Sequence, residues 1–147
     1  MKISIAADHG GYELKQALIQ SLDRYSFMDL GTDSLESVHY PNFADLVCKS
    51  ILNKESDLGI LICGTGIGIS MRANRFFGIR AALVHDVHSA TMAKAHNNAN
   101  VLCLGGRSTP LDDAILFINT WVSTQFESGR HLNRISMIDE PIEYPSS

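Results

Sequence analysis

Cysteine is scarce in this sequence, and the few cysteines that occur are not paired. The 147 residues include three of them, Cys48, Cys63 and Cys103. Their odd number and the absence of a Cys-x-x-Cys pair argue against a disulfide framework or a zinc site. We therefore expect reduced thiols, a cytoplasmic protein and no bound metal.

Long apolar runs and an excess of positive charge are also missing. The first ten residues, MKISIAADHG, hold too short an apolar run for a signal peptide, because Asp8 interrupts it. No stretch approaches the roughly 20 apolar residues of a membrane span. The 12 Lys and Arg residues are outnumbered by 16 Asp and Glu residues, which gives a net charge of −4. We expect neither a membrane nor a nucleic acid as partner, although a few converging arginines could still bind a small anion.

The sequence does contain an alternation of strand-like and helix-like segments, in a single domain over residues 1–147. Its length and its 45% apolar residues suit one core. Short apolar runs predict strands, and apolar residues at helical spacing predict helices. The predicted strands cover residues 2–7, 27–31, 58–62, 78–84 and 100–106. The predicted helices cover residues 13–24, 41–51, 66–76, 87–95 and about 110–125, and residues 138–147 are predicted to form an exposed tail.

The order of these segments predicts the fold class. Strands that are apolar on both faces, each followed by a helix, are typical of a parallel sheet covered on both sides. With right-handed crossovers the class is α/β, a three-layer Rossmann-like sandwich of about five strands. Such sheets bind ligands beyond the carboxyl ends of their strands. Those ends carry Asp8-His9, Gly31-Thr32, Cys63-Gly64-Thr65, His85-Asp86 and Gly105-Gly106-Arg107.

The last predicted helix has the most complete start signal. Thr109 is predicted to be its N-cap, with Pro110 in the first turn and Asp112 at the capping-box distance.

A glycine-rich loop, Gly64–Gly68, opens the third predicted helix. Amides at a helix N-terminus can bind anions, and glycine lets a ligand approach the backbone closely. The dinucleotide-binding fingerprint needs a third glycine where Ile69 stands, so that interpretation fails in its strict form. A tight strand-to-helix turn without a ligand is the alternative.

Cys63 immediately precedes this loop. The positive end of a helix dipole favours the thiolate form, which acts as a nucleophile or a base. A cysteine phosphatase would need an arginine at position 69, where Ile69 stands instead. The alternative is an inert buried thiol, which is what the apolar surroundings of Cys48 and Cys103 predict for those two residues.

Other polar groups have simple structural explanations of their own. Asp8-His9 can be an ordinary turn, and His96-Asn97 can be a helix C-terminus whose histidine only faces the helix dipole. Arg130 and Arg134 lie four residues apart on one helical face, which suits a phosphate but also suits a solvated basic surface. The preceding helix spans about 24 Å and leads away from the predicted ligand edge. If these arginines bind a ligand, we therefore expect them to do so in a partner subunit.

Six ordered motifs together resemble the type B ribose-5-phosphate isomerases, in the superfamily that they share with galactose-6-phosphate isomerase. The resemblance extends to about Ile138. Residues Arg72, His85 and Ser128 depart from the expected pattern. The motifs are DHGGYELK from Asp8, YPNFA from Tyr40, GILICGTGIGIS from Gly59, GIRAA from Gly78, HNNANVLCLGGR from His96 and GRHLNR from Gly129.

The resemblance implies the interconversion of ribose 5-phosphate and ribulose 5-phosphate, a step of the pentose phosphate pathway, without a cofactor or metal. It implies that Cys63 is the base, that amides of Gly64, Thr65, Gly66, Ile67 and Gly68 hold the enediolate, and that Thr65 relays a proton. It further implies that His96, aided by Asp8, opens the sugar ring.

For substrate binding, the resemblance implies that His9, Arg107, Arg130 and Arg134 hold the phosphate and that Asn97 and Tyr40 contact the sugar. Only the last two arginines are assigned to a neighbouring chain. The expected assembly is a homodimer with its active site at the subunit interface, and pairing into tetramers is left open. Three alternatives also remain: the same reaction on a six-carbon sugar phosphate, a cysteine phosphatase, and a non-catalytic nucleotide-binding module.

Overall fold

The computed structural model describes residues 1–145, so the last two residues of the predicted tail lie outside the described part. Five strands form one sheet in the order β2-β1-β3-β5-β4, and every neighbouring pair is parallel. This confirms the predicted fold class. The strands are β1 (Lys2–Ala7), β2 (Ser26–Asp29), β3 (Leu58–Cys63), β4 (Ala81–Leu83) and β5 (Val101–Gly105).

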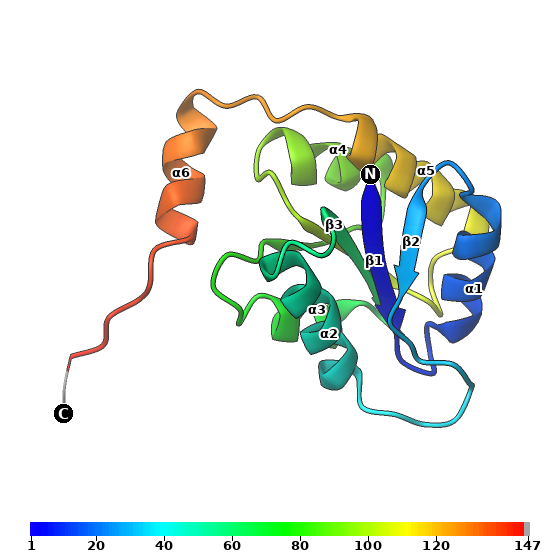
Figure 1. The fold of residues 1–147 in the computed structure, drawn as a ribbon. Coiled ribbons are helices and arrows are strands. Elements are labelled where there is room, and N and C mark those ends of the chain that lie inside the picture. The colour runs from blue at the N-terminus through cyan, green and yellow to red at the C-terminus, as the bar shows by residue number, and fades with distance from the viewer. Residues whose placement is uncertain (146–147) are drawn as a thin grey trace.

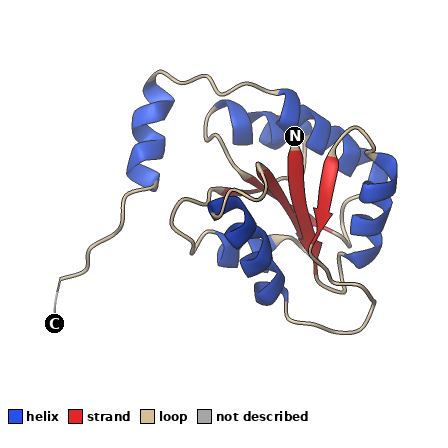
Figure 2. Cartoon of the chain, viewed as in Figure 1, coloured by secondary structure: helices blue, strands red, loops and turns tan. Residues whose placement is uncertain are grey.

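Helices cover both faces of the sheet (Figures 1 and 2). Helices α1, α4 and α5 share one apolar cluster with the sheet, and helices α2 and α3 share another. No helix within residues 1–145 is both long enough and apolar enough to cross a membrane. The helices are α1 (Tyr12–Ser21), α2 (Tyr40–Leu52), α3 (Ile67–Ala73), α4 (Val87–Ala95), α5 (Leu111–Ser123) and α6 (Arg130–Ile138).

Helix α6 stands beside this sandwich, at the end of an extended segment that follows α5 (Figure 1). Two of its side chains, His131 and Ile135, are buried. An ion pair of 2.8 Å between Arg80 Nη1 and Asp139 Oδ2 holds its C-terminal end against the body. Leu132 and Met137 remain 53% and 70% exposed, so α6 carries an uncovered apolar surface.

The predicted start of α5 is wrong. Pro110 itself is the N-cap, in extended conformation, and no side chain caps the helix. Because Pro110 takes the N-cap position, Thr109 lies one residue too early to cap. A capping box does form at α4, where Asp86 Oδ1 accepts from Ser89 N at 2.6 Å and Ser89 Oγ accepts from Asp86 N at 3.2 Å.

Strand β4 is shorter than the predicted range 78–84. Gly78 has a φ of +88° and lies within a turn that the Ile79 amide closes by donating to Phe76 O at 3.1 Å. The Arg80 amide donates to Asn100 Oδ1 at 2.8 Å, so a side chain takes the place of a ladder partner there. The strand therefore begins at Ala81.

Gly11, the N-cap of α1, packs directly against the central strand β3. A Cβ atom at this position would lie 2.6 Å from the carbonyl oxygen of Ile62 in β3. We expect Gly11→Ala to lower the free energy of unfolding by about 1–3 kcal/mol, because backbone atoms would have to move apart. Urea denaturation monitored by circular dichroism measures the change. The matched control is Gln20→Ala on the exposed face of α1, for which less than about 0.5 kcal/mol is expected. Equal stability of the two variants would contradict the steric argument.

Candidate functional site

Cys63 is the last residue of β3 and lies at the carboxyl edge of the sheet. Its side chain is almost buried, with 4% of the residue exposed. The Gly66 amide donates to Cys63 Sγ at 3.2 Å, because Gly66, with a φ of +79°, turns the chain back over the thiol. The next amide, of Ile67, donates to Thr65 Oγ1 at 3.2 Å. The loop therefore directs amide hydrogens toward a sulfur and a hydroxyl oxygen.

The loop after β1 lies against this thiol loop. Buried Asp8 accepts from the amides of Gly10 at 2.8 Å and Gly11 at 3.2 Å through Oδ1. A Cβ on Gly10 would lie 3.1 Å from Gly64 Cα, so the two loops are in backbone contact. His9 accepts from the Val38 amide through Nδ1 at 3.2 Å, which positions its ring toward the loop after β2.

Two further side chains close the site. Arg107 follows β5, and its Nη1 would lie 2.9 Å from a Cβ on Gly64. The Tyr40 hydroxyl, from the first turn of α2, would lie 2.6 Å from a Cβ on Gly68. Glycine at both positions lets these side chains approach the loop this closely. The structure thus brings together Asp8, His9, Tyr40, Cys63, Thr65 and Arg107.

The other two cysteines lie inside α2 and β5 rather than at a strand end. Burial, together with the Asp45 carboxylate, raises the pKa of the Cys48 thiol to about 12. Burial also raises the pKa of Cys103 well above its usual value. Both residues therefore stay protonated near neutral pH, as expected for inert core cysteines.

His96 and Asn97 do not lie beside Cys63 in the same chain. Helix α4 leaves the carboxyl end of β4, and His96 caps its far end, shortly before β5 begins at Val101. Strand β5, of about 16 Å, separates that end from the edge that carries Cys63. The geometric argument that assigned the two arginines to a neighbouring chain therefore applies equally to His96 and Asn97, and that assignment stays a prediction.

Arg130 and Arg134 lie at this opposite edge with His96, as predicted from the length of the preceding helix. The Glu127 amide donates to Ala95 O at 3.0 Å, which brings the start of α6 to the end of α4. Both arginines are exposed, whereas His131 between them faces inward.

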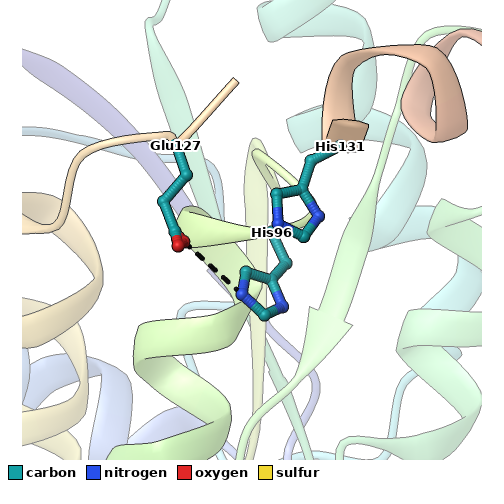
Figure 3. A group of neighbouring side chains, drawn as sticks. All are labelled: His96, Glu127 and His131. Carbon is teal, nitrogen blue, oxygen red and sulfur yellow. Dashed lines mark ion pairs between the residues drawn. The ribbon is translucent and has the colours of Figure 1, made fainter. Parts of the chain in front are cut away.

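Two residues beside His96 were missed by the sequence analysis as site residues. The His131 ring stacks on the His96 ring with centroids 4.1 Å apart and planes 16° apart. Glu127 Oε2 lies 3.5 Å from His96 Nε2 (Figure 3). Burial, reinforced by the neighbouring His96 and Arg130, holds the pKa of His131 below its usual value. The sequence held one signal of this arrangement. His131 lies four residues before the apolar Ile135, which indicates that His131 faces inward with it.

The three residues that depart from the expected pattern, Arg72, His85 and Ser128, are all exposed. Arg72 forms a two-pronged ion pair with Asp45, at 2.7 and 2.9 Å. His85 is exposed, and Ser128 has a φ of +59°, a conformation that glycine adopts more easily.

The fold and the site define a class of protein: a doubly wound α/β protein with a thiol, a carboxylate and a guanidinium group gathered at the carboxyl edge of its sheet. Comparisons with known proteins narrow this class. A family model described as Ribose/Galactose Isomerase matches residues 3–138. The chain belongs to this family, and it is an enzyme, a sugar phosphate isomerase.

Individual relatives are similar over almost the whole chain. Ribose-5-phosphate isomerase B of Escherichia coli is 40% identical over 139 residues, which cover 93% of each chain. The crystal structure of a ribose 5-phosphate isomerase from Thermotoga maritima is 48% identical, with a TM-score of 0.92, and covers 94% of this chain and 97% of its own. A Mycoplasma genitalium ribose-5-phosphate isomerase B with bound ribulose-5-phosphate is 41% identical, with a TM-score of 0.89, and covers 94% and 93%.

Proposed function

We propose that this enzyme interconverts D-ribose 5-phosphate and D-ribulose 5-phosphate through an enediolate, with Cys63 as the base. The observation that carries the proposal is the Cys63 thiol at the base of an amide-lined loop, next to Asp8 and Arg107. The names of the relatives from E. coli and T. maritima support the choice of a five-carbon substrate.

The proton transfer starts from the open-chain aldose. The Cys63 thiolate takes the proton from C2, the electrons of that C–H bond form a C1–C2 double bond, and the negative charge moves to O1. Thr65 passes a proton between the two oxygens. The Cys63 thiol then returns a proton to C1, which leaves a carbonyl at C2. Amides of Gly64–Gly68 stabilise the charge on the oxygens, the largest contribution that a protein usually makes to such a step.

Ring opening and phosphate binding use residues of two chains. His96 of a second copy, aided by Asp8 of the first, gives a proton to the ring oxygen. His9 and Arg107 of the first chain hold the phosphate together with Arg130 and Arg134 of the second. Tyr40 and the second copy's Asn97 contact the sugar. Because the phosphate is remote from C1 and C2, its binding contributes orientation.

A homodimer accounts for this division of the residues. In a twofold dimer the same surface of each copy meets the other, so the His96 edge of each chain can complete the Cys63 edge of its partner and form two equivalent sites. Exposed apolar side chains at the His96 edge support such an interface: Phe77, Leu132, Met137 and Ile138 are 53–70% exposed. We place the enzyme in the cytoplasm, where its thiol would stay reduced.

The substrate proposal is tested by assaying the purified chain with ribose 5-phosphate, galactose 6-phosphate and allose 6-phosphate. We expect kcat/KM to be highest for ribose 5-phosphate. If kcat/KM were instead highest for a six-carbon sugar phosphate, the assignment of the substrate would be wrong, but the proposed proton transfer would be unaffected. No turnover of any sugar, combined with tight calorimetric binding of adenine nucleotides, would contradict the proposal altogether.

A further inference from the structure

His96, Glu127 and His131 form a cluster of metal-ligating side chains outside the Cys63 loop. They come from the end of α4, the segment before α6 and the first turn of α6, and they converge as Figure 3 shows. One ligating atom from each residue lies within 4.8 Å of the other two. The pairing of segments distant in the sequence explains why spacing alone did not predict this site.

One separation in the cluster already matches that between two ligands of a single zinc ion. Zinc binds histidine nitrogen and carboxylate oxygen at about 2.0–2.2 Å, so two ligands of a tetrahedral ion lie about 3.4 Å apart. The distance between His96 Nε2 and Glu127 Oε2 is 3.5 Å. The third ligand, His131, stacks on the His96 ring with planes 16° apart, so its ring must turn before both nitrogen lone pairs can point at one ion. The ligating atoms, which lie at most 4.8 Å apart, must then approach by up to about 1.4 Å, and the Glu127 side chain, 52% exposed, can adjust to the new position.

The types of ligand select the ion. Two imidazoles and one carboxylate suit zinc and its neighbours in the first transition series, whereas magnesium and calcium prefer oxygen ligands alone. Three protein ligands also leave a position open for water or another ligand. The negative charge of Glu127 partly offsets the two nearby arginine charges.

We propose that His96, Glu127 and His131 bind one zinc-like divalent ion per chain, and that the bound ion inhibits the isomerase. The inhibition rests on the proposed function, because the ion would occupy the nitrogen lone pair of His96 that ring opening needs. The ion is an inhibitor here and not a cofactor, so the cofactor-free chemistry described above is unchanged.

Binding is tested without substrate, by calorimetric titration of Zn²⁺ into the chelator-treated full-length protein. We expect one ion per chain. Glu127→Gln, a substitution at a half-exposed side chain, and His131→Ala each change a ligand, so each should weaken binding by at least the roughly 10–100-fold that loss of an outer-shell partner costs. The matched control is His88→Ala, an exposed histidine outside the cluster, which should leave the affinity unchanged. Co²⁺ absorption should report tetrahedral nitrogen and oxygen ligands in the wild type and should change in Glu127→Gln.

Three results would overturn the site: no binding, binding that is the same in Glu127→Gln and His88→Ala, or binding that is lost in Cys63→Ala instead. Inhibition is then measured as the ratio of turnover with and without Zn²⁺ in each variant. We expect a chelator to reverse the inhibition, and we expect the Zn²⁺ needed for half inhibition to rise in Glu127→Gln by the same factor as the dissociation constant. Zinc binding is measured without sugar, so the absence of binding would not count against the proposed isomerase activity. Conversely, the absence of turnover would not count against a measured zinc affinity.

Discussion

Cys63→Ala is expected to lower kcat for ribose 5-phosphate by about 10²–10⁴-fold, the contribution typical of a positioned general base. The Gly66 amide donates to the sulfur, and Asp8 and Arg107 lie on adjoining loops, so the substitution removes the one side chain at the centre of the site. The loop itself should persist. Its backbone is held by hydrogen bonds that do not involve the thiol, from Gly106 N to Cys63 O at 2.8 Å and from Arg107 N to Gly64 O at 3.1 Å.

Because the loop persists, substrate binding should be retained while turnover is lost. Calorimetry with ribose 5-phosphate should give a dissociation constant within a few-fold of the wild type, and a coupled assay for ribulose 5-phosphate should show the loss. The matched control is Cys48→Ala, which removes a thiol that is buried and protonated, and should keep kcat near the wild-type value. Turnover of Cys63→Ala near the wild-type value would mean that another group is the base.

The sequence was sufficient to predict the sheet and its ligand edge, because each buried strand is a continuous apolar run. Strands β1, β3 and β5 are buried along nearly their whole length, and their carboxyl ends carry Asp8, Cys63 and Arg107. Parallel topology alone then brings these three residues to one edge. Shorter elements were less predictable, because single side chains decide where they start: Asn100 shortens β4, and Pro110 displaces the cap of α5.

The position of His96 could also have been predicted from the sequence. The length of the helix before Arg130 predicted that this arginine lies far from its own ligand edge. The same reasoning applies to α4, which leads from the carboxyl end of β4 to His96 and would have placed His96 and Asn97 at the far edge as well. The contacts of Glu127 and His131 with His96 could not be predicted, because they depend on how the segment after α5 packs against α4.

Two inactive variants, Cys63→Ala and His96→Ala, are expected to restore activity to each other when they form a mixed dimer. If Cys63 of one chain works with His96 of the other, one of the two sites in the mixed dimer has lost both residues and the other site is complete. Mixed dimers isolated through two different affinity tags should therefore show about half of the wild-type kcat per dimer. A random mixture in which half of the dimers are mixed should show about a quarter.

The reciprocal pairing is the control for this result. A chain that carries both substitutions, paired with a wild-type chain, should give an inactive mixed dimer, because each site then lacks one of the two residues. If both residues instead worked within one chain, the two outcomes would be exchanged: the wild-type chain would keep one full site, and the two single variants would have none. The two mixed dimers contain the same side chains and differ only in how these are distributed, so differences in folding or stability cannot mimic the exchange. The strand that separates His96 from Cys63 makes the first pattern the expected one, since a chain cannot bring its own His96 to its own thiol without unfolding α4 from the sheet.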